Sequence, residues 1–325
     1  MRYPEYLKRN DAIGITACSM GVLDKLDQYI ETTDYFKDKG FNIVETDNVK
    51  TDGVVSGSAD MRAEQLIDLY NNDDVKLVSI ARGGDFLFDM LPSIDFDIID
   101  NKVKWISGSS DPTSLLFYIT TKLDIATIYS PCNMTGFSGE ISDYHNNFVD
   151  IIEGKTNKQY KFDKCESHFH ADVFDKDNVW KNLNGDVLEE GILIGGCIDV
   201  LKDVIGTKYD NVKEFINKYK KHGFIWYFDI FNMSKEVLYN TLLQFKYAGW
   251  FENANAIVFG KIAFPNGFID LSYEELICMA LPDIKIVYNF DIGHVNPSFT
   301  MINGKYVRLI SNVSEGSIEF LENIL

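Results

Sequence analysis

The sequence predicts an α/β protein of two domains, the first built around a parallel sheet and the second of mixed α+β type. Three observations lead to this prediction. Apolar strands alternate with amphipathic helices through the first half, the alternation becomes irregular in the second half, and 325 residues exceed the usual size of a single hydrophobic core. Hydrophobic residues make up 46% of the chain, which excludes a disordered protein.

The first half repeats a strand followed by a helix. Short apolar runs predict the strands, and apolar residues at helical spacing predict the helices between them. In chain order the expected elements are a strand at 11–17, a helix at 23–39, a strand at 41–45, a helix at 61–71, strands at 75–81 and 104–106, a helix at 112–122 and a strand at 125–129. Because this alternation is typical of a parallel sheet covered by helices, we predict a flavodoxin- or Rossmann-like domain over residues 1–150.

The second half follows a weakly patterned segment. Residues 146–184 are charged and aromatic without a long periodic element, so we predict an inter-domain connection over 151–190. Beyond it we expect strands at 191–194, 224–228, 256–259 and 284–288, helices at 234–247 and 273–280, and a hairpin over 300–309 that turns at Asn303-Gly304. These elements predict an α+β domain over residues 191–325.

Composition limits the partners and the compartment. Forty-nine acidic and 31 basic residues give a formal net charge of −18, which opposes attraction to nucleic acid or to an anionic membrane. The five cysteines are widely spaced and contain no CxxC pair, so neither a disulfide framework nor a zinc site is expected. No apolar run has the length of a signal peptide or a membrane span. We therefore expect a cytoplasmic protein.

Three loops follow strands of the predicted parallel sheet at one edge, where functional groups gather in such sheets. They are residues 18–21, 82–85 and 108–111. In the third loop Ser110 precedes Asp111 and Pro112, which are typical of a helix start, so its hydroxyl would lie near the positive end of a helix. The alternative is an ordinary strand-to-helix turn. In the second loop, consecutive glycines would let main-chain N–H groups approach a ligand closely.

A serine nucleophile needs a base and a carboxylate that orients the base. Among the five histidines, His294 follows the apolar strand IKIVYNF in a loop whose path Gly293 and Pro297 fix. Asp229 directly follows the apolar run FIWYF. Each also has a structural interpretation, the histidine as a hydrogen-bonding group and the aspartate as a helix cap.

Segments spread along nearly the whole chain are each similar to a segment of one known protein family. In the first half DAIGITACS is similar to GDTIGIVAPS, GSADMRAEQL to a segment with a serine, an arginine and a helix, IARGGDFLFDMLPSIDFDII to RGGYG…LLPYLD, and SGSSDPTSLL to GYSDITAL. In the second half LIGGCIDVLKDVIGT is similar to LIGGNL…GT, IWYFDIFNMSKEVLYNTLLQFKYAG to LFLED…LxxLxxAG, and FDIGHVNPSFTMINGKYVRL to FGHxxPxxTxPxGxxxxL. The chain thus resembles the LD-carboxypeptidase family of serine peptidases, including its branch of microcin C immunity proteins.

The resemblance implies a role for each matching residue. Ser110 is the implied nucleophile, His294 the general base, and Asp229 stands where the family has the glutamate that orients the histidine. The implied oxyanion donors are the main-chain N–H groups of Gly84 and Asp111. Arg82 would contact a substrate carboxylate or phosphate, and Gly83 is a further implied substrate-binding residue. The resemblance also implies a homodimer, and the triad requires neither a metal nor another cofactor.

Four positions depart from the family pattern or add to it. Asp229 is one methylene shorter than glutamate, and Cys197 and Asp85 replace an asparagine and a tyrosine in segments expected to contact the substrate. Trp180 precedes the LIGG segment at about the distance of a tryptophan that, in the immunity branch, is implied to stack on adenine. Its alternative interpretation is an aromatic residue buried at a domain interface.

These observations predict a serine hydrolase that cleaves an amide bond in a small-molecule substrate. We favour detoxification of an aminoacyl-nucleotide of the microcin C type. The first alternative is removal of the terminal D-alanine from a murein tetrapeptide. The second is a ligand-binding homologue that has lost catalysis, because a loss of reach of about 1 Å at Asp229 can lower the rate on the order of a hundredfold.

Overall fold

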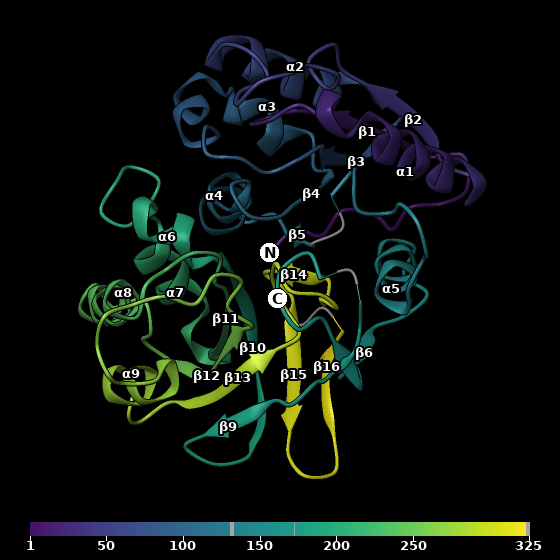
Figure 1. The fold of residues 1–325 in the computed structure, drawn as a ribbon. Coiled ribbons are helices and arrows are strands. Elements are labelled where there is room, and N and C mark those ends of the chain that lie inside the picture. The colour runs from purple at the N-terminus through teal and green to yellow at the C-terminus, as the bar shows by residue number, and fades with distance from the viewer. Residues whose placement is uncertain (131–132, 172, 323–325) are drawn as a thin grey trace. The chain divides into compact units, whose positions relative to one another are not determined.

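The computed structural model describes residues 1–130, 133–171 and 173–322, and its chain divides into two compact units (Figure 1). The first unit comprises Met1–Thr156 and Thr300–Ile302, and the second comprises Asn157–Phe299 and Asn303–Leu325. Cys18, Cys165, Cys197 and Cys278 are not joined in disulfide bonds, whereas Cys132 lies outside the described residues. Among the helices of the described ranges, none has the length and apolar character needed to cross a membrane.

The first unit contains a six-stranded sheet with the order β14-β5-β4-β3-β1-β2, in which strands β1 to β5 pair in parallel. Its elements are β1 (Ala12–Thr16), η1 (Leu23–Lys25), α1 (Leu26–Asp38), β2 (Asn42–Glu45), α2 (Ala59–Asn71), β3 (Val75–Ile80), η2 (Phe88–Ser93), α3 (Phe96–Asn101), β4 (Trp105–Gly108), α4 (Thr113–Leu123), β5 (Thr127–Tyr129), α5 (Asp143–Ile152) and β14 (Met301–Asn303). Strands β1 and β4 are buried at every residue, as strands with helices on both faces must be. The predicted parallel-sheet domain is confirmed.

The second unit contains an eight-stranded sheet with the order β6-β16-β15-β10-β11-β12-β13-β9. Its strands are β6 (Lys158–Tyr160), β9 (Lys181–Leu183), β10 (Val187–Cys197), β11 (Phe224–Asp229), β12 (Ala254–Gly260), β13 (Lys285–Phe290), β15 (Tyr306–Ser311) and β16 (Gly316–Phe320). Its helices are α6 (Ile198–Val204), α7 (Val212–Tyr219), η3 (Lys220–His222), α8 (Lys235–Tyr247) and α9 (Tyr273–Ala280). A separate two-stranded ribbon joins β7 (Lys164–Cys165) to β8 (Lys176–Asp177).

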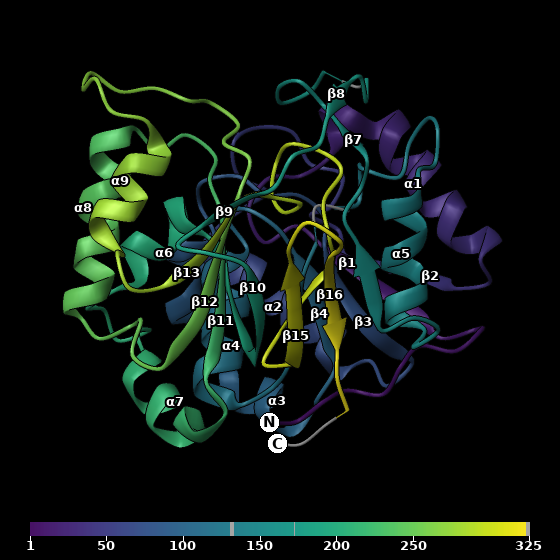
Figure 2. The same ribbon diagram turned by 90° about the horizontal axis from the view of Figure 1, so that it is seen from below.

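Parallel strands β10 to β13 form the centre of this second sheet, and antiparallel strands flank them on both sides. Strand β11 is buried at each of its six residues and lies between β10 and β12. Helices α8 and α9 pack against each other beside the parallel strands (Figure 2). Serine caps begin both helices, since Ser234 accepts the Val237 N–H and Ser272 forms a capping box with Glu275. The mixed α/β fold class predicted from the sequence is therefore confirmed in this half also.

The predicted hairpin around Asn303-Gly304 is wrong. Strand β14 pairs in the six-stranded sheet, whereas β15 pairs with β10 and β16 in the eight-stranded sheet. The chain does turn at Gly304, but the Asn303 side chain binds the second sheet. Its Oδ1 accepts hydrogen bonds from the Gly195 N–H and the Tyr227 hydroxyl, each at 3.0 Å. These buried hydrogen bonds fix the segment to β10 and β11, which local turn propensity does not report.

Candidate active site

Ser110 occupies a strained corner between β4 and α4. Its φ is +64°, a left-handed conformation that is uncommon for any residue except glycine and that is concentrated at functional sites. The backbone is held on both sides, because the Ser110 N–H donates to the Tyr129 hydroxyl at 3.0 Å and the Ser110 carbonyl accepts the Thr113 N–H at 2.9 Å. The N-cap position of α4 is occupied by Pro112, and no side chain accepts a hydrogen bond from the first turn of this described helix. Neither Ser110 nor Asp111 therefore forms the side-chain cap expected from the sequence.

The Asp111 carboxylate instead fixes the neighbouring glycine loop. It is 4% exposed, and its Oδ2 accepts the Leu87 N–H at 2.9 Å. Ser19 also hydrogen-bonds to this carboxylate and accepts the Phe86 N–H at 3.2 Å. The pKa of Asp111 is raised above its ordinary value, because the effect of burial outweighs the hydrogen bonds from Ser19 and Leu87, which lower the pKa. The side chain thereby connects the Ser110 corner to two other loops.

Gly83 and Gly84 lie where a side chain would not fit. A Cβ on Gly83 would be 3.2 Å from the Ser110 Cβ, and one on Gly84 would be 2.4 Å from the Ser19 Oγ. Gly84 also has a φ of +154°, which residues with a Cβ rarely adopt. Gly83 therefore brings its main chain close to the Ser110 side chain, and Gly84 brings its main chain close to Ser19. Within the described residues, neither the Gly84 N–H nor the Asp111 N–H donates a hydrogen bond.

Two arginines form hydrogen bonds at this edge of the sheet. Arg62 is buried and donates from Nη1 to the Cys18 carbonyl and to the carbonyl of Phe86, the residue after the second loop, each at 2.7 Å. The Met20 N–H also donates to the Gly83 carbonyl at 3.3 Å, which joins the first loop to the second. Arg82 binds both carboxylate oxygens of Asp24, at 2.7 and 3.0 Å, and Asp85 is exposed. The three loops that the sequence assigned to one edge are thus joined by specific hydrogen bonds.

Asp229 and His294 form a hydrogen-bonded pair in the second unit. The His294 Nδ1 lies 2.8 Å from Oδ2 and 3.0 Å from Oδ1 of Asp229, and the His294 main-chain N–H donates to Oδ1 at 3.3 Å. Asp229 ends the buried strand β11, and its side chain is 1% exposed against 15% for His294. Because a carboxylate only accepts, Nδ1 carries the proton and Nε2 is the basic nitrogen of the neutral ring.

Gly293 explains how the short aspartate reaches the ring. It has a φ of +108°, and a Cβ at this position would be 2.2 Å from the Asp229 Oδ1. The absence of a side chain therefore lets the histidine loop approach the carboxylate directly, and the Gly293 N–H is in turn held by the Ser298 Oγ at 2.9 Å. With the loop this close, both carboxylate oxygens of Asp229 lie within 3.0 Å of the His294 Nδ1.

The pKa of His294 reflects two opposing effects. Burial lowers it, but the charge and hydrogen bond of Asp229 and the charge of Asp199 outweigh burial and raise the pKa above its ordinary value of 6.5. The imidazolium form is therefore stabilised inside the protein. This is the property required of a base that must hold a proton during a reaction.

The loop that carries His294 is clamped by the segment between β6 and β9. The buried Asp291 carboxylate accepts Lys261 Nζ at 2.6 Å, Asn178 Nδ2 at 2.7 Å and the Phe162 N–H at 3.2 Å. Main-chain and side-chain groups of Glu166 bind the Asn296 backbone at 2.8 and 2.9 Å. The segment expected to be an inter-domain connection thus stabilises the histidine loop.

An aromatic cluster surrounds His294. The ring centroid of Phe231 lies 4.5 Å from the imidazole, and that of Phe169, from the loop of the β7–β8 ribbon, lies 5.7 Å away. Phe264 is 44% exposed and contacts both phenylalanines, with centroid distances of 5.1 and 5.5 Å. Partly exposed rings beside a base offer a face for a planar ligand group.

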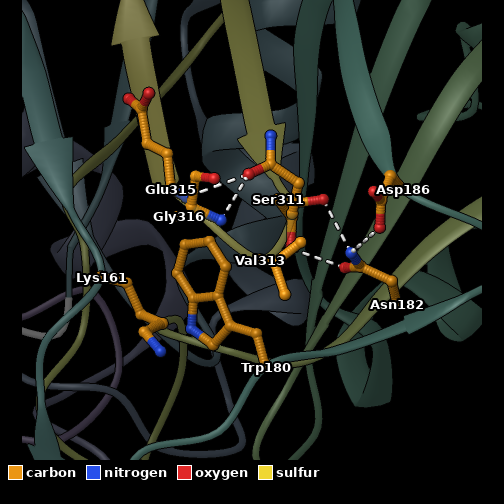
Figure 3. A pocket seen from close by; sticks show the side chains of 10 residues that line it. Lys161, Trp180, Asn182, Asp186, Ser311, Val313, Glu315 and Gly316 are labelled. Carbon is orange, nitrogen blue, oxygen red and sulfur yellow. Dashed lines mark hydrogen bonds between the residues drawn. The ribbon is translucent and has the colours of Figure 1, made fainter.

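Trp180 packs elsewhere in the second unit. Its ring lies 4.4 Å from Phe290 and 6.0 Å from Phe299, and it lines a cavity of about 330 Å³ with Lys161, Asn182 and Asp186 (Figure 3). Cys197 is buried, and its thiol faces the Asp199 carboxylate with a sulfur–oxygen distance of 3.8 Å. Burial raises the pKa of Cys197, and the charges of Asp229 and Asp199 raise it further.

We expect Gly293→Ala to uncouple His294 from Asp229. The added Cβ would overlap the carboxylate, so the ring would move away and its pKa would fall because burial would remain without the compensating charge. The measurement is an NMR titration of the His294 ring. Gly185→Ala is the matched control, since its φ of +100° imposes similar strain while no atom lies within 4 Å of the new Cβ. A titration of His294 that is the same in Gly293→Ala and in the unsubstituted protein would contradict this account.

Several residues of the site could not be identified from the sequence. Asp199 follows the Gly195-Gly196-Cys197 segment by two residues, and Phe169 lies in a stretch without periodicity. Ser19 belongs to a loop at the predicted edge, but nothing local indicates that it binds Asp111. Within the described ranges, no group of three or more His, Cys, Asp or Glu side chains comes together as a metal site.

Comparisons with known proteins identify related sequences and folds. A family model described as the LD-carboxypeptidase N-terminal domain matches residues 13–130, and one described as the C-terminal domain matches residues 190–309. A putative carboxypeptidase of Vibrio cholerae is 28% identical over 316 residues, which cover 91% of each chain. The microcin C7 self-immunity protein MccF of Escherichia coli is 25% identical over 333 residues, which cover 97% of this chain and 94% of that protein.

Solved structures share the fold over nearly the whole chain. MccF in complex with aspartyl sulfamoyl adenosine superposes with a TM-score of 0.83 at 22% identity and 99% coverage of both chains. A muramoyltetrapeptide carboxypeptidase from Oxalobacter formigenes superposes with a TM-score of 0.76 at 20% identity, covering 95% of this chain and 98% of that one. Because the two family models match residues 13–130 and 190–309, well over half of the sequence, the chain belongs to the LD-carboxypeptidase family.

Proposed function

We propose that this protein is a serine hydrolase that cleaves an amide bond, with Ser110 as nucleophile, His294 as general base and Asp229 as the orienting acid. The observation that carries the proposal is the buried Asp229–His294 pair, in which two short contacts from Nδ1 leave Nε2 as the basic nitrogen. The left-handed Ser110 beside Gly83 supports it from the first unit. Membership of a peptidase family agrees with this chemistry.

In the proposed reaction, Ser110 Oγ attacks the substrate carbonyl carbon while His294 Nε2 takes the hydroxyl proton. The negative charge of the tetrahedral intermediate falls on the carbonyl oxygen, where the N–H groups of Gly84 and Asp111 would donate hydrogen bonds. The imidazolium, stabilised by Asp229, then gives its proton to the leaving nitrogen as the carbon–nitrogen bond breaks. Water, deprotonated by His294, hydrolyses the acyl-serine ester and restores the enzyme.

The alternative of a binding protein without catalysis rested on the reach of Asp229. Both carboxylate oxygens lie within 3.0 Å of the imidazole Nδ1, so distance gives no reason for lost turnover. The raised pKa of His294 also supports a working base. We therefore prefer the catalytic proposal.

For the substrate we propose an aminoacyl-nucleotide conjugate. The support is the aromatic cluster of Phe169, Phe231 and Phe264, whose rings would stack on a nucleobase, each stacked base contributing about 1–3 kcal/mol. MccF, which has the same fold, has been solved with aspartyl sulfamoyl adenosine. A murein tetrapeptide is the second candidate, since the relatives include carboxypeptidases. In either case Arg82, which binds Asp24, is the proposed contact for a carboxylate or phosphate of the substrate.

The test compares cleavage of aspartyl sulfamoyl adenosine with release of D-alanine from a murein tetrapeptide. We expect the nucleotide substrate to have the higher kcat/KM, and Phe169→Ala to raise its KM about tenfold or more, because one stacking contact is lost. Trp180→Ala distinguishes the other aromatic candidate: a larger effect on KM there would assign stacking to Trp180. Efficient cleavage of the tetrapeptide alone would move the assignment to murein.

A further inference from the structure

Asp199 is fixed by three donors near the Asp229–His294 pair. It lies in the first turn of α6, directly after β10, and its Oδ2 and Oδ1 accept the main-chain N–H groups of Phe231 and Asn232, each at 2.9 Å. The Cys197 thiol points at the same Oδ2 from 3.8 Å. Bidentate acceptance from consecutive N–H groups leaves the loop after β11 little freedom.

That loop supplies one wall of the histidine site. Phe231 is two residues beyond Asp229, and its ring lies 4.5 Å from the His294 ring at an interplanar angle of 41°. Asp229 holds the ring through Nδ1, while Phe231 covers part of its face. A shift of Phe231 would therefore let the imidazole rotate even with Asp229 in place.

We propose that Asp199 is a positioning residue of the active site, which holds Phe231 against His294 and so keeps the imidazole in its productive orientation. The expected effect of Asp199 on kcat/KM rests on the proposed hydrolase function, whereas its effect on the position and pKa of the His294 ring does not. No segment resemblance used above assigns a role to this aspartate, which acts without touching the reacting atoms.

Asp199 also contributes charge. The charged groups that act on His294 are Asp229 on β11 and Asp199 on α6, and both raise its pKa against the effect of burial. Cys197 on β10 stays a neutral thiol because burial raises its pKa, and the neighbouring rings of Phe169 and Phe231 carry no charge. Removing Asp199 therefore lowers the pKa of His294, which deprotonates at lower pH. The acid limb of kcat/KM moves to lower pH by the same amount.

The experiment uses Asp199→Ala, Asp199→Asn and Asp199→Glu in the full chain, with Asp203→Asn as the matched control. Asp203 lies one turn further along α6, is 61% exposed and pairs with Lys202. The readouts are an NMR titration of His294 and the pH profile of kcat/KM for aspartyl sulfamoyl adenosine. We expect Asp199→Ala and Asp199→Asn to lower the pKa of His294 and to reduce kcat/KM about ten- to a hundredfold, with partial rescue in Asp199→Glu.

Two results would overturn the proposal. One is a His294 titration in Asp199→Ala that matches Asp203→Asn and the unsubstituted protein. The other is a fall in kcat/KM with the pH profile and the titration unmoved, which would indicate only a structural role. If the unsubstituted protein cleaves neither candidate substrate, the proposed function fails, and the titration alone still decides whether Asp199 acts on the ring.

Discussion

Ser110→Ala is expected to abolish hydrolysis while leaving ligand binding intact. Without Oγ no acyl-enzyme forms, and loss of a serine nucleophile lowers kcat by about 10⁴- to 10⁶-fold. The rate enhancement that remains comes from the oxyanion donors and from substrate binding. Alanine removes only the hydroxyl from a backbone already held by Tyr129 and Thr113, so the fold of the corner should persist. The measurement is single-turnover cleavage of aspartyl sulfamoyl adenosine together with its binding by calorimetry.

Ser109→Ala is the control, because it removes a hydroxyl from the adjacent residue of the same turn. We expect it to retain kcat within a few fold. Equal cleavage by Ser110→Ala and the unsubstituted protein would reject Ser110 as nucleophile. A large loss in Ser109→Ala alone would move that role by one residue.

Asp229→Asn is expected to lower kcat by about 10⁴-fold with little change in fold. An amide in place of the carboxylate presents an N–H₂ group that cannot accept from Nδ1, which favours the wrong tautomer of His294 and leaves the imidazolium without its counter-charge. The variant should also lower the pKa of His294, because burial would then act with less opposition. The pH dependence of kcat, followed alongside the NMR titration, measures both effects.

Asp229→Glu tests whether the shorter acid is a defect. The approach of Gly293 leaves no room for another methylene, since a Cβ on that glycine would already lie 2.2 Å from Oδ1. We therefore expect glutamate to displace the histidine loop and to lower kcat rather than raise it. Turnover that rises in Asp229→Glu would show instead that the aspartate limits catalysis.

Much of the fold followed from local sequence. Continuous apolar runs such as VKLVSIA and FIWYF predicted buried strands, and β3 and β11 lie there. Apolar residues at helical spacing predicted α8 and α9 to within a residue. Periodicity reports burial of one face, which is a local property of the chain. The hairpin at Asn303-Gly304 was wrong because the strands on either side of the turn pair with different sheets.

The candidate site divides in the same way. Ser110, Asp229 and His294 were predicted because each follows an apolar strand or matches a family segment, and their roles remain the proposal made above. Phe169 and Asp199 were not, because their importance comes from rings and N–H groups more than 30 residues away in the chain. Contacts of that kind leave no spacing pattern for a single sequence to reveal.

The sequence by itself determined the α/β class, the family and the identity of the three candidate catalytic residues, because these depend on periodicity and on short ordered segments. Only the tertiary structure decided that the short Asp229 reaches His294, since this depends on a positive φ at Gly293 and on a missing Cβ 2.2 Å from the carboxylate. It likewise decided that phenylalanines surround the imidazole while Trp180 packs on Phe290. Reach and ring contacts are distances in space, and the folded backbone alone sets them.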